Sequence, residues 1–173
     1  HSDAPKIAVN SNQTVHLVFG ESPSGPLQYY HVEYTKSDQG LKNFSEPIQL
    51  SRRKSGTVLS SHFPSLELDG HGNPIVQWEL FRDKSRHPKG LRITYSPNQG
   101  DTFLAPIMVP KSNQPEGSFN GSQQGLLREK VAVNEQGEIA VVNSTFLENV
   151  SSDIWLWRGS INKEASKQIQ GGK

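Results

Sequence analysis

Three separate stretches of the chain show the same alternation of apolar and polar residues. Each has a short apolar run, a turn rich in Asn, Asp and Gly, and a second alternating run. The stretches are residues 7–19, 66–78 and 131–143, and they align without gaps. Alternation with period two on both sides of such a turn is typical of a β-hairpin. The pattern therefore predicts three copies of one hairpin, offset by 59 and 65 residues.

Two further strands are expected after each hairpin. The third strands end in aromatic residues and are predicted at 31–34, 91–95 and 154–157. The fourth strands are predicted at 44–50, 103–109 and, from a weaker pattern, 165–169. Four strands that recur about every 60 residues indicate the blades of a β-propeller. No segment shows sustained helical periodicity.

We therefore expect an all-β chain that forms a single propeller domain over residues 1–173. The three four-stranded blades are predicted at approximately 5–50, 63–110 and 128–170.

The turn between the third and fourth strands of the middle repeat carries a recognisable motif. It reads Ser-x-Asn-x-Gly-x-Thr-Phe and is formed by Ser96, Asn98, Gly100, Thr102 and Phe103. Asn98 is expected to hydrogen-bond to the backbone two residues later, Gly100 to take a positive φ, and Phe103 to begin the fourth strand. The motif resembles the Asp-box of the sialidase-like BNR-repeat propellers, with Asn where Asp is commoner. The resemblance implies that this turn braces a hairpin on the face away from the ligand.

Three blades do not close a ring, whereas the family that the motif resembles has six. An open arc exposes apolar surface on its first and last blades, which a soluble monomer rarely tolerates. The strand residues expected on these surfaces are Val9, Val15, Leu17, Ile139, Val141 and Trp155. We expect a second copy to complete the ring as a homodimer; the alternative is that further blades lie on a longer chain.

Composition narrows the classes of function. A formal net charge of +1 argues against a dedicated nucleic-acid binder, and no apolar run is long enough for a membrane-spanning helix. The absence of cysteine excludes disulfides and thiolate metal sites. No metal-ligand spacing is present, so no metal and no cofactor are expected. We expect a secreted or periplasmic protein.

The loops on the expected ligand face are rich in positive charge. They join second to third strands, or fourth strands to the next blade. Their basic residues are Arg52, Arg53, Lys54, Arg82, Lys84, Arg86, His87, Lys89 and Lys111. Such a face suits a carboxylate or sulfate group on an acidic glycan.

The candidate ligand-binding residues are Arg52, Arg53, Arg82, Asp83, Arg86 and Glu116. The arginines are candidates for clamping a sugar carboxylate, and Asp83 or Glu116 for an acid. Sialidases that resemble this fold use three arginines, a Tyr–Glu nucleophilic pair and an Asp acid, a set that cannot be matched to this sequence. The sequence leaves three functions open: an acidic-glycan binder, a sialidase-like exo-glycosidase, and a non-catalytic scaffold for protein–protein interaction.

Trp78, Trp155 and Trp157 are expected to pack between strands rather than to stack on sugars.

Overall fold

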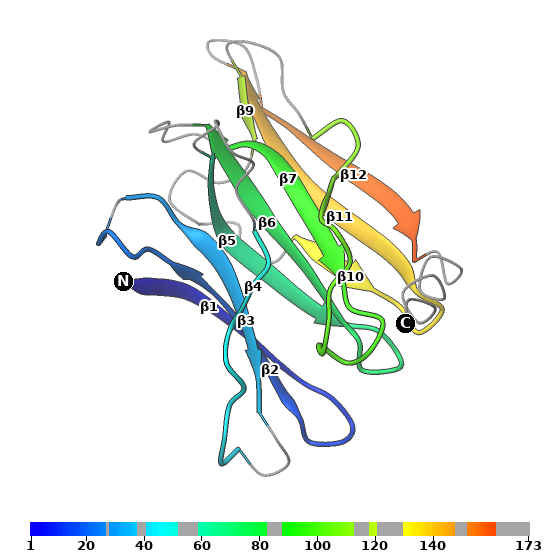
Figure 1. Cartoon of the computed structure of the whole chain (residues 1–173). Helices are drawn as coiled ribbons and strands as arrows, with labels where there is room; N and C mark the ends of the chain where they lie inside the picture. Colours follow the sequence, from blue (N-terminus) through cyan, green and yellow to red (C-terminus); the bar gives the residue numbers. More distant parts are fainter. Residues whose placement is uncertain are drawn as a thin grey trace.

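The computed structural model describes residues 1–26, 28–37, 41–51, 59–82, 88–112, 118–120, 130–147 and 152–161. Within these ranges the chain forms twelve strands and three antiparallel sheets, which lie side by side from the blue to the orange end of the chain (Figure 1). The all-β class and the three-sheet organisation are thus confirmed. The blade boundaries given above stay predictions.

The first two sheets have the same strand order, in which each strand pairs with the next along the chain. Sheet 1 contains β1 (Ser2–Val9), β2 (Val15–Glu21), β3 (His31–Lys36) and β4 (Ile48–Gln49). Sheet 2 contains β5 (Leu59–Leu68), β6 (Pro74–Arg82), β7 (Pro88–Tyr95) and β8 (Ile107–Met108). The predicted hairpins and third strands are therefore present in both sheets.

Sheet 3 differs at its first strand. It contains β9 (Ser118–Asn120), β10 (Val131–Val133), β11 (Glu138–Leu147) and β12 (Ser152–Ser160). β9 and β10 pair with different parts of the same edge of β11, so together they take the place of β1 or β5. The sequence pattern did not predict β9. The fourth strand predicted at 165–169 lies outside the described residues.

The fourth strands of sheets 1 and 2 are shorter than predicted. Neither Phe44 nor Phe103 begins a strand, because the ladders form only at Ile48 and Ile107. A proline directly precedes each of these isoleucines, and it has no backbone N–H to donate to the ladder. Phe103 packs instead against the core between sheets 1 and 2.

Two apolar clusters hold the sheets together. The first joins Val18, Val32, Tyr34 and Leu50 of sheet 1 to Leu66, Val76 and Trp78 of sheet 2. The second joins Ile75, Leu91, Ile93 and Val109 of sheet 2 to Val131, Ile139 and Val141 of sheet 3. Sheet 2 thus lies between its neighbours and buries both faces, which is why β6 is buried from Ile75 to Phe81.

The prediction for the outer apolar surfaces was partly wrong. Val15, Ile139 and Val141 are buried, and Trp155 packs into the second cluster. Side chains alternate between the two faces of a strand, so the neighbours of these residues in β11 and β12 point outward. They include Val142, Ile154 and Leu156. Trp78 is fully buried, as predicted, and Trp157 also packs in the second cluster.

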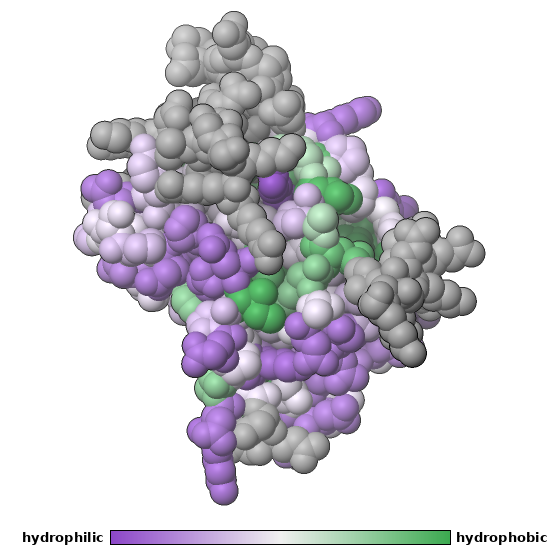
Figure 2. Space-filling view, in the orientation of Figure 1, coloured by the Kyte–Doolittle hydropathy of each residue, from purple (hydrophilic) through white to green (hydrophobic). Residues whose placement is uncertain are grey.

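The surface is mixed. Figure 2 shows apolar surface near the middle of the view, with hydrophilic surface beside and below it. Among the described residues there is no helix long and apolar enough to span a membrane.

Candidate functional site

Strand direction gives the array two distinct ends. The hairpins β1–β2, β5–β6 and β10–β11 lie at one end, with the turns that follow β3 and β7; we call this the hairpin end (Figure 1). The first strands begin, and the second strands finish, at the opposite end, which we call the loop end. The first strands also lie next to one another, because β5 contacts both β1 and β10.

An imidazole and a carboxylate meet at the loop end. His62 of β5 is hydrogen-bonded through Nε2 to Oδ1 of Asp3 on β1, at 2.5 Å. The two residues are 59 positions apart, which is also the offset between the hairpin turns of their sheets. They therefore occupy equivalent places in adjacent first strands. The His62 side chain is 11% exposed and that of Asp3 is 35% exposed, so a ligand can reach the pair from the Asp3 side.

Both first strands are bulged directly after this pair. The ladder register shifts between Asp3 and Lys6 in β1, and between His62 and Ser65 in β5. The residue after each member of the pair has a positive φ, 48° at Ala4 and 51° at Phe63. For a bulky residue such as Phe63 this conformation costs about 1–3 kcal/mol. Bulges re-aim side chains at sheet rims, and here they turn two equivalent side chains toward each other.

Aromatic rings fix the His62 imidazole on both sides. Its ring centroid lies 3.8 Å from that of Tyr30 and 3.9 Å from that of Phe63, with both pairs stacked. The backbone of Tyr30 is itself tied to β5, since its N–H donates to Ser60 Oγ and its carbonyl accepts from the Ser61 N–H. Tyr30 is buried, whereas Phe63 is partly exposed and presents an apolar surface beside the pair.

A glycine provides the space for the imidazole. A Cβ at Gly20, on β2, would lie 2.7 Å from His62 Cδ2, closer than side chains approach one another. Any larger residue at position 20 would therefore displace the ring from Asp3.

The environment of His62 also determines its protonation. Burial lowers its pKa, against the opposing effect of the Asp3 hydrogen bond and charge. The ring is therefore neutral at pH 7, with the proton on Nε2 directed to Asp3. Nδ1 then keeps a lone pair that can accept a hydrogen bond or a proton.

The sequence-predicted site residues lie elsewhere in the chain. Arg52, Arg53, Asp83, Arg86 and Glu116 fall outside the described residues, and of Arg82 only the backbone, at the end of β6, is described. Asp3 and His62 were not predicted. The 59-residue repeat, extended four residues upstream of its first aligned position, would have paired them.

The predicted turn residues do come together, with one difference. Asn98 Oδ1 accepts from the N–H of Thr102, four residues later rather than two, at 2.9 Å. The Ser96 hydroxyl, which also donates to Asn98, accepts from the Gly100 N–H at 2.7 Å. Gly100 has the expected positive φ, 90°. The Phe103 ring meets Tyr34 of sheet 1 edge-on at 4.8 Å, so the turn also contacts the neighbouring sheet.

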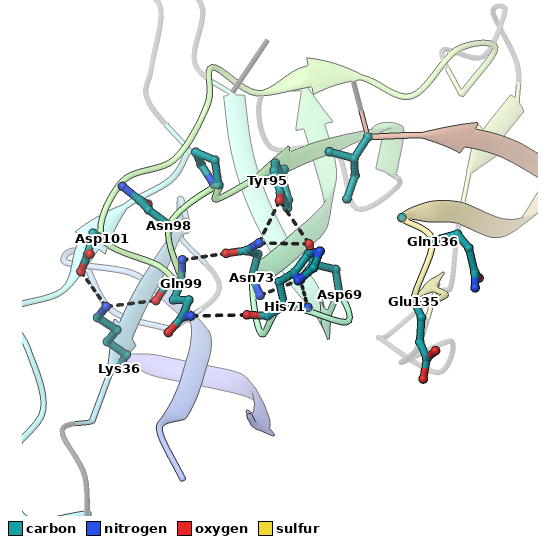
Figure 3. A pocket seen from close by; sticks show the side chains of 13 residues that line it. Lys36, Asp69, His71, Asn73, Tyr95, Asn98, Gln99, Asp101, Glu135 and Gln136 are labelled. Atoms are coloured by element: carbon teal, nitrogen blue, oxygen red, sulfur yellow. Dashed lines mark hydrogen bonds and ion pairs between the residues drawn. The ribbon is translucent and has the colours of Figure 1, made fainter. Parts of the chain in front are cut away.

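A polar pocket of about 590 Å³ lies at the hairpin end (Figure 3). Glu135 and Gln136 of the β10–β11 hairpin lie across it from the β5–β6 hairpin. The remaining polar lining comes from Lys36, Asp69, His71, Asn73, Tyr95, Asn98, Gln99 and Asp101.

Several polar groups of this pocket already bond to one another. Asp69 accepts from the N–H groups of His71 and Asn73 and from the Tyr95 hydroxyl. Burial and the Asp69 charge raise the pKa of Tyr95 to about 12. Lys36 pairs with Asp101 at 2.6 Å. This network braces the turns, and its groups are engaged within the fold rather than directed to a ligand.

A buried ion pair joins sheets 2 and 3. The Lys130 ammonium contacts the Glu79 carboxylate, and both side chains are almost completely buried. Burial lowers the pKa of Lys130, and the Glu79 charge opposes this. Because water and ligands do not reach it, the pair is a structural feature. In the described ranges, no group of three or more His, Asp or Glu could hold a metal ion.

Several solved structures of carbohydrate-active enzymes contain a fold similar to that of this chain. A polysaccharide lyase of family PL25, an ulvan lyase, superposes with a TM-score of 0.63 at 12% identity, over 91% of this chain and 41% of that one. A family 117 glycoside hydrolase of Zobellia galactanivorans gives 0.54 at 13% identity, over 91% and 52%. The endo-arabinase of Bacteroides thetaiotaomicron gives 0.51 at 12% identity, over 94% and 57%.

These identities establish similarity of fold alone. This chain spans about half the length of the structures that it matches. The sequence matches no protein-family model and no curated protein.

Proposed function

We propose that this protein binds an acidic polysaccharide at the loop end, around Asp3 and His62. The observation that carries the proposal is the matched pair of bulges, which brings a carboxylate and a neutral imidazole together beside a partly exposed aromatic ring. Strained, equivalent backbone positions that converge on a polar pair are more typical of a site than of a packing requirement.

Each group in this set has a use in sugar recognition. The Asp3 carboxylate can accept hydrogen bonds from two sugar hydroxyls, and His62 Nδ1 can accept a third. The exposed edge of Phe63 offers an apolar surface to the C–H face of a pyranose ring. Beside Asp3 lies His1, whose Nε2 is 3.8 Å from Asp3 Oδ2 and whose ammonium pairs with Glu21. Recognition of acidic groups is assigned to the arginines of the loops.

Those loops adjoin β5, which carries His62, and β6, which pairs with β5. Arg52 and Arg53 belong to the segment that leads into β5, Arg82 is the last residue of β6, and Arg86 belongs to the segment that follows it. Arginine pairs with carboxylate or sulfate in bidentate geometry, which suits it to this role. An ulvan lyase that superposes on this chain is solved with an oligosaccharide of glucuronate and sulfated rhamnose, a ligand of the same class.

Titration calorimetry tests the proposal with three oligosaccharide probes. These are a glucuronate–sulfated rhamnose oligomer, its desulfated form and a neutral arabinan oligomer. We expect the sulfated oligomer to bind most tightly, and Asp3→Asn or His62→Gln to weaken binding about tenfold or more. Asp101→Asn makes the same chemical change at the hairpin end and should leave affinity unchanged. Equal affinity for all three probes would remove the acidic-glycan assignment.

Assays of the same samples also test two alternative functions. Release of reducing ends, or of unsaturated products, would make the protein a polysaccharide-cleaving enzyme, with a sialidase-like glycosidase as one case. Absence of glycan binding would favour a non-catalytic scaffold for protein–protein interaction.

The proposal includes a sialidase-like architecture in a secreted or periplasmic protein. In a six-bladed ring completed by a second copy, the first strands would surround a central axis, and the loop ends would form one continuous face.

A further inference from the structure

The contact between sheets 1 and 2 and the contact between sheets 2 and 3 join equivalent faces of the repeated sheet. One face of sheet 2, with Leu66, Val76 and Trp78, packs on sheet 1. The corresponding face of sheet 3, with Val131, Ile139 and Val141, packs on sheet 2. We call this the leading face of each sheet and the opposite one its trailing face. Each internal contact therefore joins a leading face to the trailing face of the preceding sheet.

The repeat identifies the leading face of sheet 1. Ile7 and Leu17 take the places of Leu66 and Val76, 59 residues further along. No described sheet packs on this face. Ile7 is 68% exposed and Val9 59% exposed, whereas Val15, which pairs with Val9, is buried. Glu33 lies on the same face, beside Phe19 in the ladder.

The trailing face of sheet 3 is open in the same way. Val142 pairs with Leu156 across β11 and β12, and Ile154 lies two residues earlier along β12. These side chains are 40%, 62% and 79% exposed. Arg158 lies on this face next to them and is exposed. The open faces thus match in apolar character. Glu21 and Glu33 lie on the leading face of sheet 1, and Arg158 and Glu138 on the trailing face of sheet 3.

We propose that the leading face of sheet 1 in one copy of this chain packs on the trailing face of sheet 3 in a second copy, and that two such contacts close a ring. The inference deepens the proposed ring by naming its contacts. Within one copy the two faces lie on opposite flanks of the array and cannot meet (Figure 1). We choose a second copy as the partner because it carries both a leading and a trailing face. Faces of these two kinds pack on each other in both contacts within the chain.

Such a contact is heterologous, because different surfaces of the two copies meet. Two copies related by a half-turn would form it twice and leave neither face open. The first strands of both copies would then surround one axis. The Asp3–His62 pairs of the two copies would face the same opening, so a long polysaccharide could contact both.

Light scattering after size-exclusion chromatography tests the contact independently of any glycan. We expect a mass of about twice the 19.2 kDa chain. Ile7→Glu or Ile154→Glu, each placing a charge in one face, should give single-chain mass. Ile107→Glu, at a similarly exposed residue on the outer strand β8, should keep the doubled mass. Circular dichroism of each variant verifies that it is folded.

Mixing the variants gives the decisive result. A copy with Ile7→Glu and a copy with Ile154→Glu still share one unaltered contact, so the mixture should recover the doubled mass although neither variant does alone. A single-chain wild type, a doubled mass in either variant, or a mixture that stays at single-chain mass would overturn the proposal. A wild-type mass that grows beyond two chains with concentration would overturn ring closure. Loss of glycan binding with the doubled mass intact would refute the proposed ligand and leave this contact standing.

Discussion

At the scale of single residues, Gly100 shows how the turn motif is tied to the neighbouring sheet. Its φ of 90° favours glycine, and a Cβ at this position would overlap the Tyr34 hydroxyl of sheet 1. That hydroxyl is also hydrogen-bonded to His16 Nδ1 at 2.7 Å. A residue that the sequence marks as a turn glycine therefore also permits contact between two sheets.

We expect Gly100→Ala to lower the free energy of unfolding by about 3 kcal/mol, because it combines backbone strain with steric overlap. Gly25 is the matched control: its φ is 103°, and a Cβ there meets nothing within 4 Å. Gly25→Ala should cost only about 1 kcal/mol, the price of the backbone conformation. Urea denaturation of both variants measures the difference. Equal losses of unfolding free energy would show that overlap with Tyr34 is not what requires glycine at position 100.

His16 makes stability depend on pH. Burial, and to a lesser degree the charge of Lys36, lower its pKa to about 4 from the usual 6.5. The unfolded chain therefore takes up a proton as pH falls through 6.5, while the folded chain does not. Stability is highest above that pH and should fall by about 2 kcal/mol between pH 7 and pH 5 from this group alone.

Denaturation at several pH values measures this slope. Ile75 takes the place of His16 in sheet 2, so His16→Ile is the natural variant. It should reduce the slope between pH 7 and pH 5 and leave the part that comes from His62, whose pKa burial also lowers. An unchanged slope would assign the dependence to other groups.

At the scale of elements, the hairpins and third strands were predictable because they depend on local alternation. Trp78 and the three-sheet organisation followed from the same pattern. The fourth strands were not, since their lengths depend on the prolines at 47 and 106 and on pairing with a distant neighbour. β9 has too few residues to carry a pattern of its own.

The outward and inward faces of sheet 3 were also beyond local reasoning. Apolar residues lie on both faces of β11, so the alternation does not predict which face packs on sheet 2. The bulges at Ala4 and Phe63 leave no turn-type signature in the sequence, which is why the Asp3–His62 pair was missed. What the sequence did contain was the offset of 59 residues that relates them.

The Glu79–Lys130 pair gives a prediction for the contact between sheets 2 and 3. Glu79→Gln leaves the Lys130 ammonium buried without a counter-charge, and we expect a loss of about 3–5 kcal/mol in the free energy of unfolding. Replacement of both residues by methionine removes both buried charges and should recover most of that loss. Denaturation of the single and double variants tests this; a double variant as unstable as the single one would show that the pair itself is required.

At the scale of the whole molecule, the described chain is an array of like sheets joined by one repeated contact. That contact explains why sheet 2 is buried on both faces and why sheets 1 and 3 each leave one apolar face open. The same repetition places equivalent first-strand residues next to one another, and the candidate site is built from this property. Fold and site therefore share one basis, the repetition of a similar sheet along the chain.

The arrangement also separates two ends with different roles. At the hairpin end, polar groups such as Asp69 and Tyr95 are bonded within the turns. At the loop end, Asp3 and Phe63 remain partly exposed beside His62. We therefore expect ligands at the loop end, although a pocket of about 590 Å³ lies at the hairpin end.

A structure of the chain with a bound glucuronate–sulfated rhamnose oligosaccharide tests this account most directly. It should show the sugar at the loop end, within hydrogen-bond distance of Asp3 and against the ring of Phe63. An oligosaccharide seated in the hairpin-end pocket, between Asp69 and Glu135, would contradict the account.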